Sequence, residues 1–340
     1  MTTTSAEESS AVPVGPPPPF DPELAAALRV INESLPPDGF ANPAIFAALR
    51  QGGPGAEPAS DEELTRGGAF TLEERTVPGP EGAPDITLLI LSPTGTTAPV
   101  PVIYHMHGGG MVLGDKRSQV PELLDTIQDL GTAMAVVSVE YRLAPETPHP
   151  GPVADCYAGL LWTAAHAEEL GYDAERILVA GSSAGGGLAA ALALMARDRG
   201  GPSLFAQLLM CPMLDDHNDT PSARQMTGLG VWDRVSNEFG WTSLLGEARG
   251  TADVSPYAAP ARATDLSGLP PAFIDVGTNE TFRDEAVAYA SRIWQAGGSA
   301  ELHVWPGAFH GFDLMVRPAV ISQDARAARV LWLRRVLSVA

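Results

Sequence analysis

The hydrophobic pattern of this chain alternates between two periods. Nearly continuous apolar runs, which are typical of strands buried on both faces of a parallel sheet, occupy residues 101–107, 134–141, 176–181, 207–213, 271–277 and 301–306. Between most of these runs lie stretches with apolar residues at helical spacing, at residues 120–130, 153–170, 184–197, 281–295 and 318–339. Strands that alternate with helices predict an α/β fold with a mostly parallel central sheet flanked by helices.

The N-terminal part follows a different pattern. Residues 1–19 are rich in Ser, Thr, Glu and Pro, which predicts a disordered tail. Short helices are predicted within residues 20–66, because the Asp-Pro pair at 21–22 supplies an N-cap and a first helical residue, and Ser60 with Glu63 fits a capping box.

Two segments that alternate polar and apolar side chains come next. Residues 71–77 and 85–92 are separated by a Pro/Gly-rich turn, which predicts an antiparallel pair of strands. The whole chain has 340 residues, of which 45% are hydrophobic. Since a single hydrophobic core stops growing near about 250–300 residues, we expect one main domain with an appended cap.

Charge and cysteine content narrow the choice of partners and compartment. Forty-one acidic against twenty-one basic residues give a net charge of −20, which repels phosphate backbones and anionic lipids, so neither nucleic acid nor a membrane surface is expected as a partner. Cys156 and Cys211 lie far apart and match neither a disulfide framework nor a metal-ligand spacing. The N-terminus lacks the basic and apolar regions of a secretory signal. We therefore expect a soluble protein in the reducing cytoplasm.

Residues 181–185, Gly-Ser-Ser-Ala-Gly, lie where a predicted strand meets a predicted helix. They match the G-x-S-x-G pattern in the strand–turn–helix context that it requires, and the register makes Ser183 the candidate nucleophile. Such a turn strains the central residue and needs small residues two positions before and after it.

Other interpretations of this stretch fit less well. The dinucleotide fingerprint G-x-G-x-x-A is present at residues 185–190, but it starts inside the helix instead of in the preceding turn. A small-residue packing surface would explain the glycines and alanines but not the register of the serine. A Walker A loop is excluded, since no Gly-Lys-Ser/Thr occurs in the chain.

A second glycine-rich element follows the first strand of the parallel set. In the sequence His-Gly-Gly-Gly at 107–110, backbone N–H groups can turn toward a point above the nucleophile, where loss of one donor typically costs about 10²–10³ in rate. His105 and His107 could instead be two metal ligands, but no companion Cys or carboxylate cluster supports this, so we expect no metal.

Together with further motifs, these elements resemble the hormone-sensitive-lipase-like (HGGG-type) bacterial carboxylesterases of the α/β-hydrolase superfamily, over residues 101–312. The motifs are HGGG at 107–110, YRLAPE at 141–146, GSSAGG at 181–186, SPYAAPARATDLSGLPPAFI at 255–274, FRDEAVAYA at 282–290 and FHGF at 309–312. Ser182 departs from the family pattern, which commonly has Asp or Thr before the nucleophile.

The resemblance implies an α/β-hydrolase fold and assigns roles to its parts. Its oxyanion hole would consist of the amides of Gly109, Gly110 and Ala184. An N-terminal helical cap at residues 20–66 would cover a catalytic domain at 67–340, with residues 215–250 contributing to the cap.

A serine hydroxyl needs a base to activate it, and the base needs an orienting acid. In this fold the order along the chain is serine, acid, histidine. His310 follows the last predicted strand and stands in the FHGF motif, so it is the expected base. The other candidates lie in a Pro-rich loop, in a helix, in a loop too early in the chain and in mid-strand: His149, His166, His217 and His303.

Several carboxylates compete for the role of the acid. Asp275 lies inside a predicted strand and Glu285 lies one turn into a helix, so both aim poorly. Aligned on the Arg-Asp-Glu of the FRDE motif, the family's catalytic acid falls on Glu280, where many relatives have Asp. Asp284 is the alternative, although with Thr281 it matches a helix-capping pattern.

The resemblance implies a serine carboxylesterase that acts through an acyl-enzyme and needs no cofactor. We expect short- to medium-chain acyl esters to be its substrates. The side chains expected to line its apolar acyl site, unless they belong to the core of the cap, are Met111, Trp232, Phe239 and Trp241. An amidase, carbamate hydrolase or lactone hydrolase would share every residue named, whereas a non-catalytic small-molecule receptor would be expected to lose members of the triad. The expected partner is a small-molecule ester, and a homodimer formed through an edge strand is an open alternative to a monomer.

Overall fold

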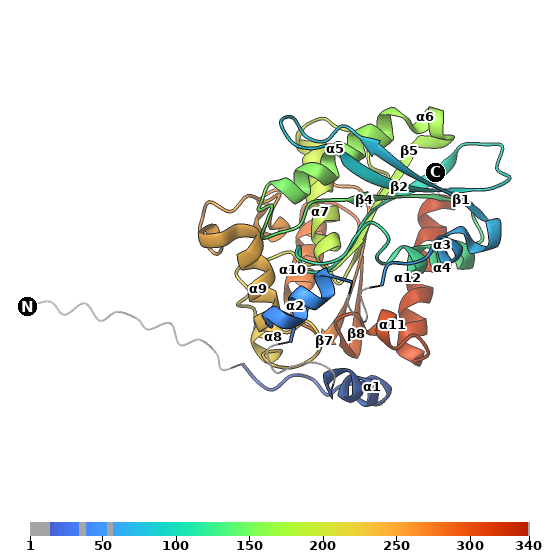
Figure 1. Ribbon diagram of the computed structural model, residues 1–340. Coiled ribbons are helices and arrows are strands. Elements are labelled where there is room, and N and C mark those ends of the chain that lie inside the picture. Colours follow the sequence, from blue (N-terminus) through green and yellow to red (C-terminus); the bar gives the residue numbers. More distant parts are fainter. Residues whose placement is uncertain (1–13, 34–38, 53–56, 339–340) are drawn as a thin grey trace, which may run out of the picture.

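The computed structural model describes residues 14–33, 39–52 and 57–338. Most of the predicted disordered tail, residues 1–13, lies outside the described residues, and residues 14–20 form neither helix nor strand. The first described helix therefore begins close to the start of the described chain (Figure 1).

The strands within these residues form one eight-stranded sheet in the order β1-β2-β4-β3-β5-β6-β7-β8 (Figure 1). β2 pairs antiparallel with β1 and β4, and all other neighbours pair in parallel. This confirms the predicted α/β fold and its antiparallel start. The strands are β1 Phe70–Val77, β2 Ile86–Pro93, β3 Val100–Met106, β4 Ala135–Glu140, β5 Tyr172–Ser182, β6 Ala206–Met210, β7 Ala272–Asn279 and β8 Ala300–Phe309.

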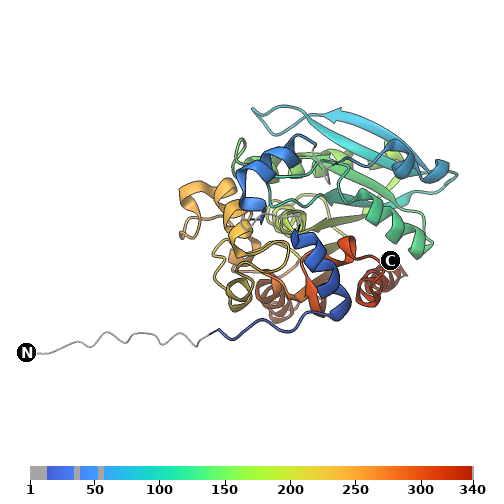
Figure 2. The ribbon, with the colours of Figure 1, turned by 60° about the horizontal axis from the view of Figure 1, so that its bottom comes forward.

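Helices cover both faces of the sheet (Figures 1 and 2). On one face, α5 (Gly151–Ala165), α7 (Ala184–Asp198) and α10 (Arg283–Gln295) share a hydrophobic core with the strands. On the other face, α4 (Val120–Leu130) and α12 (Val320–Ser338) form a second core with them. Because each inner strand is covered on both sides, its apolar run is continuous, as the sequence pattern predicted.

Shorter elements complete the described fold. The remaining α-helices are α1 Pro22–Glu33, α2 Pro43–Arg50, α3 Asp61–Thr65, α6 Ala167–Leu170, α8 Pro221–Gln225, α9 Arg234–Leu245 and α11 Phe312–Met315. The 3₁₀ turns are η1 Gly39–Ala41, η2 Arg66–Gly68, η3 Gly246–Ala248 and η4 Pro260–Arg262.

Two helix predictions need correction. The helix predicted over 153–170 is interrupted at His166, whose φ of −109° separates α5 from α6. The predicted capping pair at the start of α10 is wrong: Phe282 is the N-cap, the Thr281 hydroxyl donates to the carbonyl of Trp232, and the Asp284 carboxylate accepts from the Ser222 N–H. Both side chains bind a distant segment instead of their own helix, which local sequence could not reveal.

The N-terminal helices start as predicted and are tied to the rest of the chain. The Asp21 carboxylate accepts from the second and third residues of α1, and α3 has its capping box. The Asp21 N–H donates to the carbonyl of Gly307, 3.1 Å away at the end of β8. Arg50, at the end of α2, donates to the carbonyls of Val112 and Ala144. The residue before α1 thus contacts the end of β8, which leads to His310, and α2 contacts the loop that follows β3.

Candidate active site

The turn between β5 and α7 holds Ser183 in a strained backbone conformation, with φ 59° and ψ −121°. A Cβ atom at Gly181 would lie 2.2 Å from the carbonyl carbon of Gly185, and one at Gly185 would lie 2.0 Å from the carbonyl oxygen of Met106. Strand, turn and helix therefore approach too closely for any other residue type at these two positions. The strain persists because the surrounding backbone fixes it: the Ser183 N–H donates to the carbonyl of Met210 at 2.8 Å.

Three side chains that are far apart in the sequence meet at this turn. The Ser183 hydroxyl lies 3.0 Å from Nε2 of His310, whose Nδ1 is hydrogen-bonded to the Glu280 carboxylate. Ser183 is 5% exposed and Glu280 is 1% exposed. The second Glu280 oxygen accepts from the Gly277 N–H at 3.2 Å, which anchors the carboxylate against the end of β7.

Burial and charge act in opposite directions on the imidazole of His310. Burial lowers its pKa, while the neighbouring Cys211 sulfur and Glu280 carboxylate raise it, so the pKa lies well above its ordinary 6.5. The ring of Phe282 meets the imidazole edge-on, with centroids 5.2 Å apart. The hydrogen bond to Glu280 places the proton of the neutral ring on Nδ1 and leaves Nε2 free to accept one.

The competing carboxylates have other partners. Asp284 pairs with Arg283 and accepts from the Ser222 N–H. Glu285 accepts from the Leu214 N–H at 2.7 Å, and its burial raises its pKa well above the ordinary value. Of the candidates following β7, the structure brings Glu280 to the imidazole.

The loop after β3 is shaped by glycines at left-handed backbone angles. Gly109 and Gly110 have φ values of 114° and 62°. A Cβ atom at Gly109 would lie 2.2 Å from the carbonyl oxygen of Leu113, and one at Gly110 would lie 2.2 Å from the ring of Trp232. Within the described residues, the N–H groups of Gly109, Gly110 and Ala184 donate no hydrogen bond, so they are available to a ligand.

The two histidines before these glycines are structural in this fold. His107 stacks on Tyr141 with ring centroids 4.1 Å apart, and the Tyr141 hydroxyl donates to the His107 carbonyl at 2.8 Å. Burial lowers the pKa of His105 to about 3 and that of His107 to about 4, so both are neutral. Neither belongs to a cluster of potential metal ligands in the described part of the chain.

The four predicted substrate contacts differ in position. Met111 and Trp232 are buried next to Gly110, and Phe239 is partly buried and meets the ring of Phe46 edge-on at 5.3 Å. Trp241 is 0% exposed. The side chain belongs to the hydrophobic core cluster that also contains Met111 and Trp232, and its role as a substrate contact stays a prediction.

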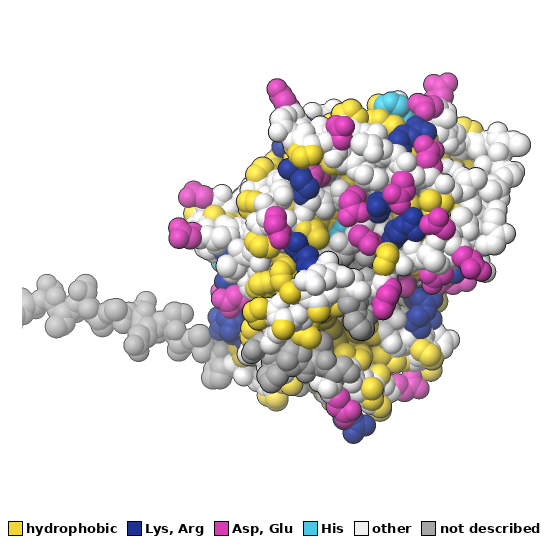
Figure 3. Space-filling model, in the orientation of Figure 1, with side chains coloured by type: hydrophobic (Ala, Val, Ile, Leu, Met, Phe, Trp, Pro, Cys, Tyr) yellow, Lys and Arg dark blue, Asp and Glu magenta, His cyan; other side chains and the backbone are white. Residues whose placement is uncertain are grey.

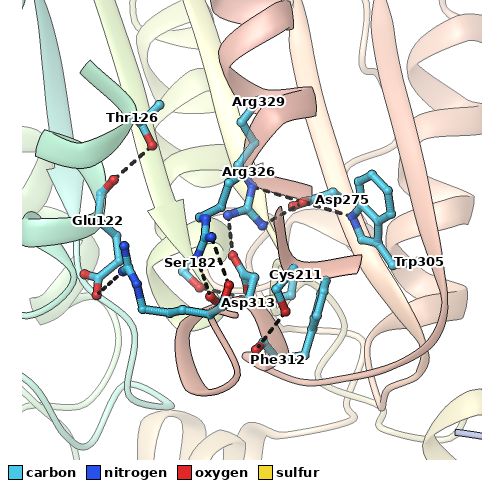
Figure 4. Close-up of polar contacts among 12 residues, drawn as sticks. Glu122, Thr126, Ser182, Cys211, Asp275, Trp305, Phe312, Asp313, Arg326 and Arg329 are labelled. Atoms are coloured by element: carbon cyan, nitrogen blue, oxygen red, sulfur yellow. Dashed lines mark hydrogen bonds and ion pairs between the residues drawn. The ribbon is translucent and has the colours of Figure 1, made fainter. Parts of the chain in front are cut away.

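A buried ion network lies behind the nucleophile turn (Figure 4). Arg329 on α12 donates to the carboxylates of Asp275 on β7 and Asp313 on α11. Trp305 also donates to Asp275, at 3.2 Å. A cavity of about 30 Å³ is lined in part by Ser182 of the turn and by Arg329 and Asp313 of the network. This volume is enough for a water molecule.

The sequence patterns do not reveal this network. Asp275 stands out in the sequence only as a candidate catalytic acid, and no pattern points to Arg329. A charged residue at a position that helical periodicity assigns to the core is the one signal that could have found it.

Comparison with known proteins agrees with this geometry. A family model described as the α/β hydrolase fold matches residues 103–314. The chain belongs to this family. This α/β hydrolase is 37% identical to the carboxylesterase NlhH of Mycobacterium tuberculosis over 76% of the chain and 82% of the relative. It is 36% identical to the esterase LipI of the same species, over 69% of the chain and 73% of the relative.

Solved structures give the same result. A bacterial heroin esterase superposes with a TM-score of 0.82 at 43% identity, covering 94% of this α/β hydrolase and 98% of that chain. A thermostable esterase from Pseudomonas putida superposes with a TM-score of 0.77 at 29% identity, covering 95% and 96%. The expected place among the hormone-sensitive-lipase-like carboxylesterases is thus confirmed. No described helix of this α/β hydrolase combines the length and apolarity needed to cross a membrane.

Proposed function

We propose that Ser183, His310 and Glu280 form the catalytic triad of this carboxylic ester hydrolase, with the amides of Gly109, Gly110 and Ala184 as its oxyanion hole. The single observation that carries the assignment is the hydrogen-bonded chain from the Ser183 hydroxyl through the His310 imidazole to the Glu280 carboxylate. Each link has the donor and acceptor that acyl transfer requires.

The first half of the reaction forms an acyl-enzyme. His310 Nε2 accepts the hydroxyl proton of Ser183 while Oγ attacks the ester carbonyl carbon, and the carbonyl oxygen becomes an oxyanion. The free amides of Gly109 and Gly110, and that of Ala184 at the positive end of α7, stabilise this charge. The tetrahedral intermediate collapses as His310 returns the proton to the departing alcohol.

The second half regenerates the enzyme. Water gives a proton to His310 Nε2 and attacks the acyl carbon, and collapse of the second intermediate releases the carboxylic acid and restores the Ser183 hydroxyl. Glu280 keeps the proton of the neutral ring on Nδ1 and stabilises the imidazolium in both halves.

The acyl group is proposed to lie on apolar side chains beside the oxyanion loop. Met111 and Trp232 adjoin Gly110, and Phe239 on α9 packs on Phe46 of α2. Figure 3 shows hydrophobic side chains gathered on the face of the molecule where α2 and α9 lie. Helices α1 and α2 would then act as the cap, with residues 215–250 contributing α9. We expect short- to medium-chain acyl esters to be the best substrates, and hydrolysis that is fastest with long chains would contradict this.

Labelling with a fluorophosphonate tests the triad. The wild-type chain is expected to take up one reagent per molecule, and the Ser183→Ala variant none. Ser182→Ala is the matched control because Ser182 is the adjacent hydroxyl, and it is expected to label normally. Labelling of the Ser183→Ala variant would contradict the assignment, and a wild-type chain that binds esters without labelling or turnover would support the receptor alternative.

The leaving group is a separate question. An amide, carbamate or lactone would meet the same triad, so rates on an aryl ester and its matching anilide should be compared. We expect the ester to be hydrolysed faster, because its alkoxide leaves more readily than the amine of an amide.

A cytoplasmic location and a homodimer stay predictions. Cys156 and Cys211 are free thiols, which suits a reducing compartment. β8 is at the edge of the sheet, and an edge strand is where a second copy could pair. Sedimentation of the wild-type chain would test the dimer.

A further inference from the structure

The thiol of Cys211 lies beside the candidate triad. Its Sγ is 3.5 Å from the Ser182 hydroxyl (Figure 4). The Cys211 sulfur, a Glu280 carboxylate oxygen and a His310 ring nitrogen all lie within 4.8 Å of one another. Cys211 follows β6 with a left-handed φ of 37°, and its N–H donates to the carbonyl of Asp275 at 2.7 Å, so the backbone that carries the thiol is fixed.

These groups have the chemistry of a soft-metal site. Thiolate, imidazole and carboxylate are the ligands that zinc takes in proteins, with three protein ligands and a fourth position left to water in open sites. Ligand atoms about 2.0–2.3 Å from one metal ion lie roughly 3–4 Å from each other, so only small side-chain shifts are needed. Cys211 and His310 are partly exposed, which gives an ion access from solvent.

We propose that Cys211, Glu280 and His310 form an inhibitory site for a soft divalent cation such as Zn²⁺ or Cd²⁺. The proposal rests on the proposed triad, because it assigns a second ligand class to two of the triad residues. A cation held there occupies the carboxylate and the imidazole on which hydrolysis depends.

The inhibition follows from the two nitrogens of the ring. Nδ1 faces Glu280 and Nε2 faces Ser183, so a cation bound to Glu280 reaches the ring through Nδ1. The Nδ1 proton moves to Nε2 through solvent, and the thiol proton is released as the sulfur–metal bond forms. The neutral ring then carries its proton on Nε2 and accepts none from Ser183.

Another potential ligand cluster on the described chain provides a control. Asp215, Asp216 and His217 lie together, but both Asp216 oxygens are bound by Arg262 and one also accepts from Gly250. A cation at this partly exposed cluster would not touch the triad.

Inhibition kinetics test the proposal in metal-free buffer with a soluble aryl ester as substrate. Zn²⁺ is expected to inhibit the wild-type chain, and a chelator is expected to restore the rate. Cys211→Ala should raise the inhibition constant at least about tenfold, since losing even a residue that only orients a metal ligand typically costs about 10–100-fold in affinity. Cys156→Ala, which removes the buried second thiol, and His217→Ala, which disrupts the other cluster, should leave it unchanged.

Cadmium supplies a readout that does not depend on turnover. Cd²⁺ bound to a thiolate has an ultraviolet charge-transfer band, which we expect at one ion per chain in the Cys156→Ala and Ser183→Ala variants and not in Cys211→Ala. Each inhibition constant is obtained from rates normalised to that variant's own uninhibited rate. Cys211→Ser replaces Cys211→Ala in these assays if the alanine variant fails to fold.

Two results would overturn the proposal: an unchanged inhibition constant in Cys211→Ala, or no inhibition and no charge-transfer band in the wild-type chain. A wrong triad assignment would be distinguishable from a wrong metal site, because Ser183→Ala would then still hydrolyse esters, whether or not cadmium binds.

Discussion

Replacement of Arg329 by methionine tests how much the buried ion network stabilises the fold. Arg329 donates through Nε and Nη2 to Asp275, at 3.0 and 2.7 Å, and through Nη1 to Asp313. Its side chain is 9% exposed. Methionine fills part of the volume but leaves two buried carboxylates without their cation. Breaking one buried pair in this way costs about 3–5 kcal/mol, so we expect a loss of at least that size in the free energy of unfolding.

The matched control is another arginine on α12. Arg335 pairs with Glu301, but its side chain is 56% exposed, and exposed pairs contribute about 0–1 kcal/mol. Urea unfolding of Arg329→Met and Arg335→Met, followed by circular dichroism, compares the two. Equal losses of stability would refute the reasoning that burial sets the cost.

The pH dependence gives a second check on the same network. Burial raises the pKa of Asp275 even with Arg329 present, so the folded state holds this proton more tightly than the unfolded state does. Stability from this group is present below its unfolded pKa and is lost as pH rises through its folded pKa. Without Arg329 that folded pKa rises further, so the deficit of Arg329→Met should shrink as pH falls toward the ordinary aspartate pKa of 3.8. A deficit independent of pH would contradict this account.

Three further predictions concern the site. Glu280→Gln should lower kcat by up to about 10⁴-fold, as loss of the orienting acid does in other triads, whereas Asp284→Asn should lower kcat far less. Steady-state kinetics on an aryl ester measure both values, and a larger loss in Asp284→Asn would make Asp284 the acid. Gly110→Ala should lower kcat by about 10²–10³, because the new Cβ would meet the Trp232 ring at 2.2 Å and displace an oxyanion donor; a normal kcat would remove Gly110 from the oxyanion hole. The acid limb of kcat/KM should have its midpoint above 6.5, because the pKa of His310 is raised and only the neutral ring accepts a proton; a midpoint below 6.5 in the pH profile would contradict this.

Much of the architecture follows from local sequence patterns. Continuous apolar runs predicted the inner strands because those strands are buried on both faces, and the helix predicted at 120–130 coincides with α4. Helix starts set by neighbouring residues, such as the capping box of Ser60 and Glu63, were also predictable. The break at His166 in the helix predicted at 153–170 was not predictable, since it leaves the hydrophobic pattern unchanged.

For the candidate site, the sequence by itself determined the nucleophile turn, because its steric requirement for Gly181 and Gly185 is local to a few residues. It also named Glu280 and His310, through their order along the chain and a family resemblance. Only the tertiary structure decided what lies beside them. How deeply Trp241 is buried, whether Cys211 faces the imidazole, and which carboxylates Arg329 neutralises all depend on segments far apart in the sequence. Such contacts are fixed by how the layers pack, and no local periodicity records them.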